Sequence, residues 1–416
     1  MQDVSSKIRA KDIFGRGLYR ENLSNVGTRI FGGRMGTIDN SVSKTFQITT
    51  TLAQHFDKVR LVFANTNAGF AVNNILAKVS VISTVADLNN SAGTWVDVLK
   101  SNQPGFCVPN SYGANRISYT VSDWVSLKSI ARTDGGTFPL LVARVCIQSV
   151  GAGLPVYGQG SSPDVYTNWE TKPGGRIWVS RQKNGNHVTN PTGFDDTTNT
   201  NQSPIIGVQY LAKGRVVSVM CVGDSIPDGI GTYRGEGFGM PICEQLSDMN
   251  GVAFEYSNCA WAGQGTAAYT KRAIDILNSP IKPDILLFAT GSPNDVSTVI
   301  TQGIVDSQSA NVETVIQKCK ATGVKIVLWT WLPTNTSIKN YGATDSIRVA
   351  ENAKWMAVKN PDVPVVDTSA LLTGDLTAGQ YQMLTGTTID GIHPSDPGLL
   401  IMANGIKPTV KNIIGL

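Results

Sequence analysis

The sequence predicts an all-β domain followed by a three-layer α/β domain, and three observations support this division. The chain has 416 residues, which exceeds the usual size of a single hydrophobic core and favours two domains. Up to residue 211, short β-like apolar runs alternate with turn-forming residues. From residue 216 onward, strand-like runs alternate with longer helical patterns. We therefore expect residues 41–212 to form the first domain and residues 213–416 the second.

The N-terminal half divides into an arm and a β-rich domain. Residues 1–40 are rich in Gly, Arg and Asn and lack periodicity, so we expect an irregular N-terminal arm. The β-like runs that follow cover residues 44–52, 58–64, 78–85, 94–99, 116–125, 138–148 and 204–211. Several short strands with few helical segments are typical of a β-sandwich, here expected to be jelly-roll-like and to serve as an accessory, carbohydrate-binding domain.

In the C-terminal half, strand-like apolar runs alternate with segments of helical periodicity. Strand-like runs lie at residues 216–222, 253–258, 284–290, 325–332 and 363–368, and helical patterns at 267–277, 299–321, 346–359 and 398–414. Strands that alternate with helices form βαβ units, which require a parallel sheet covered by helices on both faces. This half is therefore predicted to be a three-layer α/β domain.

Composition excludes several classes of function. The formal net charge of +4 is spread along the chain without a basic cluster, so no nucleic-acid partner is expected. No apolar stretch of about 20 residues is present, and the charged N-terminus lacks a signal-peptide core, so we expect a soluble protein without membrane insertion. The six cysteines form no C-x-x-C pair, which indicates free thiols, and His55 and His187 have no Cys or Glu nearby at the spacing of metal ligands. No cofactor or metal is expected.

Ser225 is the candidate nucleophile. It follows the apolar run 216–222 in Gly223-Asp224-Ser225, and a glycine-rich segment and a helical pattern come after it. This places the serine where a strand meets a helix, at the carboxyl edge of the sheet, where ligands bind in open α/β folds. The tripeptide alone is weak evidence, since it arises by chance in roughly one chain of this length in ten.

His393 is the candidate general base. It lies in Asp390-Gly391-Ile392-His393-Pro394, between the last strand and the last helix. A carboxylate three residues earlier can hold the imidazole Nδ1–H and leave Nε2 free to take a proton. An exposed histidine in such a loop is more often only solvated, so its value comes from its agreement with Ser225.

Two further residues are candidate donors to an oxyanion. Gly263 follows the second strand of the α/β domain and Asn294 the third, so both lie at the same sheet edge as Ser225. Gly263 tolerates the backbone angles that turn an N–H toward a site, and Asn294 can donate from its amide. The alternatives are an ordinary turn glycine and a helix-capping Asn-Asp pair.

The order of these four blocks resembles the SGNH hydrolases, also called the GDSL esterase/lipase family, whose blocks carry Ser, Gly, Asn and His. The resemblance covers residues 216–416 and implies a flavodoxin-like sheet and ester hydrolysis through an acyl-enzyme. By analogy Ser225 is the nucleophile and His393 the base, oriented by Asp390. The Ser225 N–H, Gly263 and Asn294 would form the oxyanion hole.

This sequence departs from the family pattern at two places. Ile226 follows the serine where the family typically has Leu, a change that preserves packing. The third block usually reads Gly-x-Asn-Asp, whereas here Ser292 occupies the glycine position, between Gly291 and Pro293. The second departure changes the backbone that leads into Asn294.

The substrate is not specified by these motifs, because members of the family cleave acetylated polysaccharides, fatty esters and thioesters. The attached β-sandwich and the polar, glycine-rich loop 226–239 favour a carbohydrate O-acetylesterase acting on bacterial surface polysaccharide. The arrangement also looks like the esterase domains of bacteriophage tail proteins, which implies an extracellular or virion location and a homo-oligomer, expected to be a trimer. A lipase, a thioesterase and an inactive glycan-binding protein are the alternatives.

Overall fold

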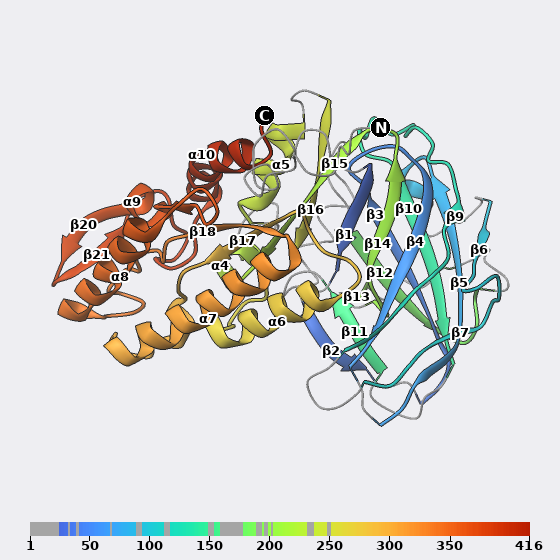
Figure 1. Ribbon diagram of the computed structural model, residues 1–416, viewed down its shortest axis with the longest axis horizontal. Helices are drawn as coiled ribbons and strands as arrows, with labels where there is room; N and C mark the ends of the chain where they lie inside the picture. The colour runs from blue at the N-terminus through green and yellow to red at the C-terminus, as the bar shows by residue number, and fades with distance from the viewer. Residues whose placement is uncertain are drawn as a thin grey trace, which may run out of the picture.

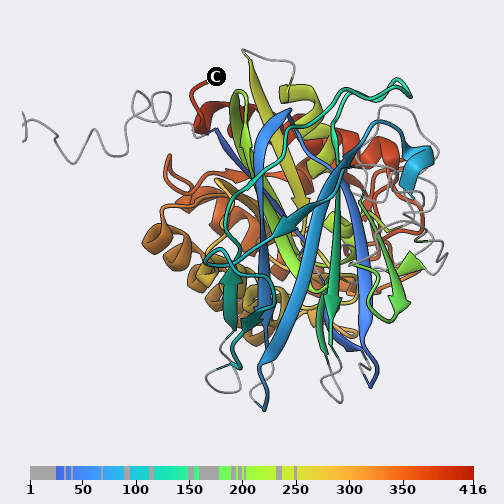
Figure 2. The same ribbon diagram turned by 90° about the vertical axis from the view of Figure 1, so that its right-hand side faces the viewer.

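The computed structural model describes residues 25–31, 34–38, 41–66, 69–88, 94–111, 117–148, 154–158, 178–188, 194, 199–200, 203–230, 237–247 and 251–416. It contains two lobes, one made of strands and one made of helices around a sheet (Figure 1). Figure 2, seen from the side of the strand lobe, shows those strands in front of the helices.

The N-terminal domain is built from antiparallel sheets. Its elements are β1 (Val26–Ile30), β2 (Arg34–Ile38), β3 (Lys44–Thr51), β4 (Phe56–Asn65), β5 (Val72–Ile82), η2 (Val85–Leu88), β6 (Val96–Val98), β7 (Phe106–Val108), β8 (Ser118–Val121), β9 (Val125–Ser126), β10 (Leu140–Ile147), β11 (Leu154–Gly158), β12 (Trp178–Asn184), β13 (Asn199–Thr200) and β14 (Ile205–Ala212). One sheet has the order β1-β14-β4-β8 with β9 on β4, and a second has the order β13-β12-β3-β10-β5-β6 with β7 on β5. Strands β2 and β11 form a separate pair.

A single apolar core holds the two large sheets of this domain together. Alternate residues of β3, Phe46 and Ile48, meet Leu61 and Phe63 of β4 in one buried cluster. The period of two in these strands is what gives each sheet one apolar face. The predicted all-β N-terminal domain is therefore confirmed, while its jelly-roll connectivity stays a prediction.

The expectation of an irregular arm over residues 1–40 is wrong at its end. Residues Val26–Ile30 form β1, which pairs with β14 in antiparallel register from Val26 opposite Leu211 to Ile30 opposite Gly207. The segment was missed because five residues with one arginine give too short a pattern to separate from a loop. Its strand state depends on a partner that lies far away in the sequence. Residues 1–24 lie outside the described part of the chain.

The C-terminal domain has the predicted parallel sheet. Its elements are β15 (Arg215–Val222), α4 (Ser225–Asp228), α5 (Gly239–Ser247), β16 (Val252–Asn258), α6 (Thr266–Asn278), β17 (Ile285–Ala289), η3 (Pro293–Asp295), α7 (Gln302–Thr322), β18 (Lys325–Trp329), η4 (Gly342–Thr344), α8 (Asp345–Val358), β19 (Val365–Val366), α9 (Thr368–Leu372), β20 (Thr373–Thr377), β21 (Gln380–Met383) and α10 (Asp396–Ile413). The sheet order is β16-β15-β17-β18-β19, with every pair parallel.

Helices cover both faces of this sheet. Helices α5 and α10 pack together on one side, and α6 and α7 pack together on the other (Figure 1). Strand β15 lies inside the sheet, and its apolar run is buried over residues 216–222 because both of its faces are covered. The three-layer domain is confirmed, and the antiparallel hairpin β20–β21 is an addition that the periodicity did not predict.

The two domains share a buried interface along β1. Its backbone N–H groups at Thr28 and Ile30 donate to the hydroxyls of Ser218 in β15 and Ser257 in β16, both at 2.9 Å. Ile30 also belongs to the apolar cluster of the α/β domain. The backbone N–H groups on the edge of β1 that faces away from β14 therefore have serine acceptors in the neighbouring domain. The sandwich thus contacts the parallel sheet directly along β1.

A buried ion pair lies at the same interface. Arg29 Nη1 contacts Glu255 Oε1 at 3.1 Å, and both side chains are fully buried. Glu255 Oε2 also accepts hydrogen bonds from the Tyr210 hydroxyl and the Ala53 N–H, each at 2.7 Å. Three segments of the sandwich therefore converge on one carboxylate of the parallel sheet.

Two other properties follow from the coordinates. All six cysteines are free, and five of them are buried, the exception being Cys107. Among the residues that the structure describes, no helix combines the length and the apolarity needed to cross a membrane.

Candidate active site

Ser225 lies at the first position of α4, immediately beyond the end of β15. Asp224 caps the helix, its side chain accepting the N–H of Ile226 at 3.0 Å. Gly223 is required by close packing, because a β-carbon there would lie 2.6 Å from Cγ of Pro227. This Ser225 turn (residues 223–225) therefore holds the serine at the carboxyl edge of the sheet, as the sequence predicted.

The structure brings Ser225, His393 and Asp390 into one hydrogen-bonded series. His393 Nε2 lies 2.9 Å from Ser225 Oγ, and His393 Nδ1 lies 2.6 Å from Asp390 Oδ2. The other carboxylate oxygen of Asp390 accepts the N–H groups of Ile392 and His393, both at 2.9 Å. These bonds fix the carboxylate against the ring, so Nδ1 carries the proton and Nε2 is available to accept one from Ser225.

Asp390 is ionised in this arrangement. Partial burial raises its pKa, but hydrogen bonds from the backbone and ring of His393 outweigh this and leave the pKa below its usual value. A carboxylate that stays charged favours the imidazolium that forms when His393 takes a proton. Asp390 is thus suited to orient and stabilise the base.

We expect Asp390→Asn to lower kcat for the preferred ester by about 10⁴-fold. Asparagine keeps an oxygen for the backbone N–H groups, but its amide can turn N–H toward Nδ1. The imidazole would then carry its proton on Nε2, where it cannot accept the proton of Ser225. Steady-state kinetics test this, with Asp375→Asn in the exposed part of β20 as a control that retains activity. A kcat for Asp390→Asn within fivefold of the wild-type value contradicts the role given to Asp390.

Gly263 lies in the loop between β16 and α6, here called the Gly263 loop (residues 259–265). Its φ of +77° is in the left-handed region, which favours glycine. The loop is tied to the Ser225 turn, since Trp261 N–H donates to Gly223 O at 3.1 Å and Ala262 N–H donates to Asp228 Oδ2 at 3.0 Å. A positive φ on an anchored, exposed loop fits a backbone donor at the site.

A buried arginine braces the same two segments from behind. Arg272 of α6 donates from Nη1 to Cys259 O at 3.1 Å and to Gly223 O at 3.4 Å. Burial lowers the pKa of Arg272 to about 10, against the opposing effects of Cys259 and Asp228, and the group remains charged at neutral pH. Sequence reasoning missed Arg272 because nothing in a helical pattern distinguishes an inward-pointing arginine from a solvated one.

Asn294 lies in the loop after β17, here called the Asn294 loop (residues 290–296). Its side-chain Nδ2 donates one hydrogen bond to Gln264 O of the Gly263 loop at 3.1 Å, and the residue is exposed. An amide Nδ2 has two N–H groups, so one remains to serve an oxyanion. The structure therefore places Ser225, Gly263 and Asn294 on three loops that are bonded to one another.

The unusual third block causes no backbone distortion. Ser292 has φ −135° and ψ 137°, an extended conformation open to any residue, so glycine is not needed at this position. Gly291 instead allows close packing, because a β-carbon there would lie 2.8 Å from the Gln308 side chain. Ser292 therefore fits this position without backbone strain, and Gly291 provides the close packing.

Asp224 and Asp295 hold these loops together from below the surface. Asp224 is fully buried, and burial raises its pKa even though hydrogen bonds from Ser292 and Ile226 and the nearby His393 lower it. Asp295 caps α6 from another loop, accepting the Thr266 N–H at 3.0 Å and the Thr266 hydroxyl at 2.8 Å. Asp224, which directly precedes Ser225, could have been recognised from sequence as a helix cap. Its contact with Ser292 could not, because the two residues lie 68 positions apart.

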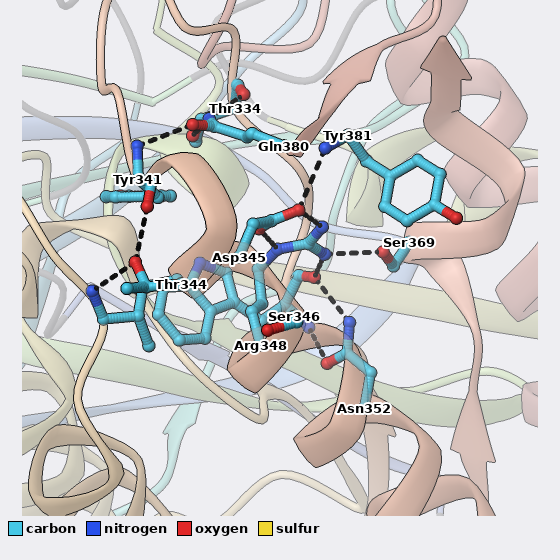
Figure 3. A network of polar contacts seen from close by, with 12 residues as sticks. Thr334, Tyr341, Thr344, Asp345, Ser346, Arg348, Asn352, Ser369, Gln380 and Tyr381 are labelled. Carbon is cyan, nitrogen blue, oxygen red and sulfur yellow. Dashed lines mark hydrogen bonds and ion pairs between the residues drawn. The ribbon is translucent and has the colours of Figure 1, made fainter. Parts of the chain in front are cut away.

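A buried polar network connects β21 with α8 and with the loop that follows β18 (Figure 3). Asn335 donates its N–H to Gly391 O at 2.7 Å. This bond joins the loop after β18 to the loop between β21 and α10 that carries His393, here called the His393 loop (residues 384–395). The loop after β18 is held by Gln380 of β21, whose Oε1 accepts the Tyr341 N–H at 2.6 Å. Beneath it, Arg348 pairs with Asp345 at 2.6 Å inside the protein. The hairpin β20–β21, which the periodicity did not predict, is therefore bonded to the loop after β18, which in turn bonds to Gly391.

The other histidines have local structural partners. His55 Nδ1 lies 2.9 Å from the Ser129 hydroxyl, and His187 Nε2 lies 2.8 Å from Asn184 O. Within the described ranges, no group of three or more His, Cys, Asp or Glu side chains is arranged to hold a metal ion.

The fold and this site place a serine, a histidine and an aspartate in one hydrogen-bonded series at the carboxyl edge of a parallel sheet. Residues 221–399 match the family model of GDSL-like lipases and acylhydrolases. The matched residues lie within the C-terminal α/β domain and span both the Ser225 turn and His393. No curated protein matches the chain.

Solved structures similar to the chain include two hydrolases. A putative acylhydrolase from Bacteroides fragilis is 21% identical, with 47% of this chain and 88% of that chain covered and a TM-score of 0.36. A carbohydrate esterase family 3 protein from Talaromyces cellulolyticus is 21% identical, with 48% of this chain and 98% of that chain covered and a TM-score of 0.35.

Proposed function

We propose that this protein is a serine esterase that removes O-acetyl groups from a carbohydrate through an acyl-enzyme. The observation that carries the esterase part is the series from Ser225 Oγ through the His393 ring to Asp390, with bonds of 2.9 and 2.6 Å. Both bonds have the lengths at which a proton can pass between heavy atoms. The arrangement is complete without a cofactor.

The reaction divides into two steps at one serine. His393 Nε2 takes the hydroxyl proton of Ser225 as Oγ attacks the ester carbonyl carbon, and the carbonyl oxygen becomes an oxyanion. The N–H groups of Ser225 and Gly263 and the Asn294 amide donate to that oxyanion. The imidazolium then gives its proton to the sugar oxygen of the ester as the bond from the carbonyl carbon to that oxygen breaks, so the sugar leaves with a free hydroxyl and acetyl-Ser225 remains. Water, activated by the same histidine, releases acetate and restores the serine.

Three features support a carbohydrate ester as substrate. Gly263, Asn294 and Asp390 are all exposed, so the mouth of the site presents polar groups to solvent. The surface carries few charges, at 16% of residues, which suits a partner that binds through hydroxyl groups. The sandwich is packed rigidly beside the hydrolase domain through β1, which gives a long glycan a second surface.

One observation favours a longer acyl chain as the second candidate. Ile389 and Ile338 expose 49% and 50% of their surfaces, respectively, on the two loops joined by Asn335 and Gly391. Exposed apolar side chains beside a catalytic histidine offer contact to a fatty acyl group, as in a lipase or a thioesterase. An inactive glycan-binding protein is the third candidate, and the intact hydrogen-bonded series makes it the weakest.

Hydrolysis of p-nitrophenyl esters from acetate to laurate, followed by acetate release from O-acetylated polysaccharides, tests the proposal. We expect the highest kcat/KM for acetate and release of acetate from a polysaccharide. A maximum at eight carbons or more would replace this proposal with a lipase. Turnover of acyl-CoA without release of acetate from any glycan would replace it with a thioesterase.

The biological setting remains part of the proposal. A β-rich domain joined to a glycan esterase fits a bacteriophage tail component, which acts outside the cell and is a trimer. Light scattering of the full chain tests the assembly, with three times the 44.4 kDa chain mass as the expected result. A monomer at micromolar concentration would contradict the tail assignment without affecting the esterase assignment.

A further inference from the structure

Ser292 lies where the three loops that carry the expected oxyanion donors meet. It precedes η3, and its side chain is fully buried at the end of β17. The pattern of the family that this chain resembles usually has a glycine at this position, which carries no hydroxyl. Because the backbone here is extended, with φ −135°, the difference lies in the side chain alone.

The Ser292 hydroxyl contacts each of the three loops once. Its Oγ donates to Asp224 Oδ2 at 2.5 Å and accepts the N–H of Asn294 at 3.2 Å. It also lies 3.4 Å from Gln264 O, the same carbonyl that accepts the amide of Asn294. Asp224 directly precedes Ser225, Gln264 directly follows Gly263, and Asn294 is itself a donor. Every contact of this hydroxyl is therefore made to an oxyanion donor or to its chain neighbour.

We propose that Ser292 is a positioning residue whose hydroxyl sets the relative placement of the three oxyanion donors. This inference rests on the proposed serine esterase activity and extends it to a residue that touches no reacting atom. The Ser225 N–H, the Gly263 N–H and the Asn294 amide must converge on one oxygen, and they come from separate loops. Oxyanion stabilisation depends on donors held at about 3 Å from a single point, so small shifts between loops are costly.

Loss of the hydroxyl has a defined local consequence. Asp224 Oδ1 is used by the N–H of Ile226, and Oδ2 receives the proton of Ser292. Without Ser292 Oγ, this buried oxygen loses that donor and the Asn294 N–H loses its acceptor. Buried polar groups that lose partners drive rearrangement of the segments that carry them. The Ser225 turn and the Asn294 loop are the segments that would move.

The test compares Ser292→Ala and Ser292→Gly with the wild-type protein. Active serines are first counted with a fluorophosphonate, and kcat is then expressed per labelled site. We expect kcat per site to fall about 10- to 100-fold in both variants, with KM changed less than about threefold. A merely structural role would lower the labelled fraction and leave kcat per labelled site near the wild-type value. That second result would overturn the proposal.

Two further variants sharpen the comparison. Ser279→Ala removes another buried hydroxyl, which bonds to Ile281 just beyond α6, at the end of that helix opposite the Gly263 loop. It should leave kcat per labelled site unchanged. Ser292→Thr restores a hydroxyl. The logarithm of its kcat per labelled site should recover at least half of the difference between Ser292→Ala and the wild-type protein. A threonine variant as slow as the alanine variant would contradict the role of the hydroxyl.

The outcome also separates this inference from the function it rests on. If wild-type protein hydrolyses no ester and Ser225 is not labelled, the proposed esterase fails and the inference fails with it. If wild-type protein is active and the Ser292 variants match it per labelled site, only the inference fails. If Ser292→Ala does not fold, Ser292→Gly gives the same comparison with the residue found in the family.

Discussion

Replacing Ser225 with alanine is expected to lower kcat for the preferred ester by about 10⁴-fold or more. The hydroxyl is placed to attack a carbonyl carbon while its proton passes to His393 Nε2, 2.9 Å away. Without it, only water positioned by His393 and the oxyanion donors remains. The measurement is initial rate against ester concentration for both proteins at equal concentration.

The fold of Ser225→Ala should be unchanged. Ser225 is buried at the start of α4, but the capping bond of this short helix comes from Asp224 and stays in place. The midpoint of thermal unfolding should lie within a few degrees of the wild-type value. Retention of more than a tenth of the wild-type kcat, with the mass of the substituted protein verified, would show that another residue is the nucleophile.

Arg29→Ala is expected to lower the free energy of unfolding by about 3 kcal/mol, the lower part of the range for breaking a buried ion pair. Glu255 would remain buried with its opposite charge removed, although Tyr210 and Ala53 would still donate to it. Urea titration followed by fluorescence and by circular dichroism measures the loss. Because β1 of the sandwich bonds to both β15 and β16 of the other domain, the urea midpoints from fluorescence and from circular dichroism should fall by the same amount.

A surface ion pair provides the matched control for Arg29. Lys78 contacts Asp97 at 3.3 Å, and the Asp97 side chain is 63% exposed. Lys78→Ala should therefore change the free energy of unfolding by less than about 1 kcal/mol. If Arg29→Ala costs no more than this control, the Arg29–Glu255 contact does not hold the domains together. If the two signals separate in the variant, the domains unfold independently.

The parts of this protein that follow from local pattern were predicted from sequence. β15 is apolar from Val216 to Val222 except at Ser218, a pattern typical of a strand covered on both faces, and Ser225 follows where that run ends. His393 could be chosen because Asp390 lies three residues earlier in the same turn. In these cases the residues that define the feature are close in the sequence, so a short stretch of residues is enough to predict it.

The features that were missed depend on partners distant in the sequence. β1 is a strand because β14, about 180 residues later, pairs with it. The hairpin β20–β21 is exposed on much of its surface, so it has no apolar alternation to detect. Ser292 was recognised only as a departure from the family pattern, since its contact with Asp224 spans 68 residues. Tertiary contacts of this kind leave no periodic trace.

Covalent labelling of Ser225 tests the central claim most directly. Wild-type protein is incubated with a fluorophosphonate, digested, and analysed by mass spectrometry, with Ser225→Ala and His393→Ala treated in parallel. We predict a single adduct on Ser225, no adduct in Ser225→Ala, and labelling of His393→Ala slowed by at least about 100-fold. An adduct on another residue, or wild-type labelling no faster than that of His393→Ala, would contradict the assignment of a Ser225–His393–Asp390 esterase.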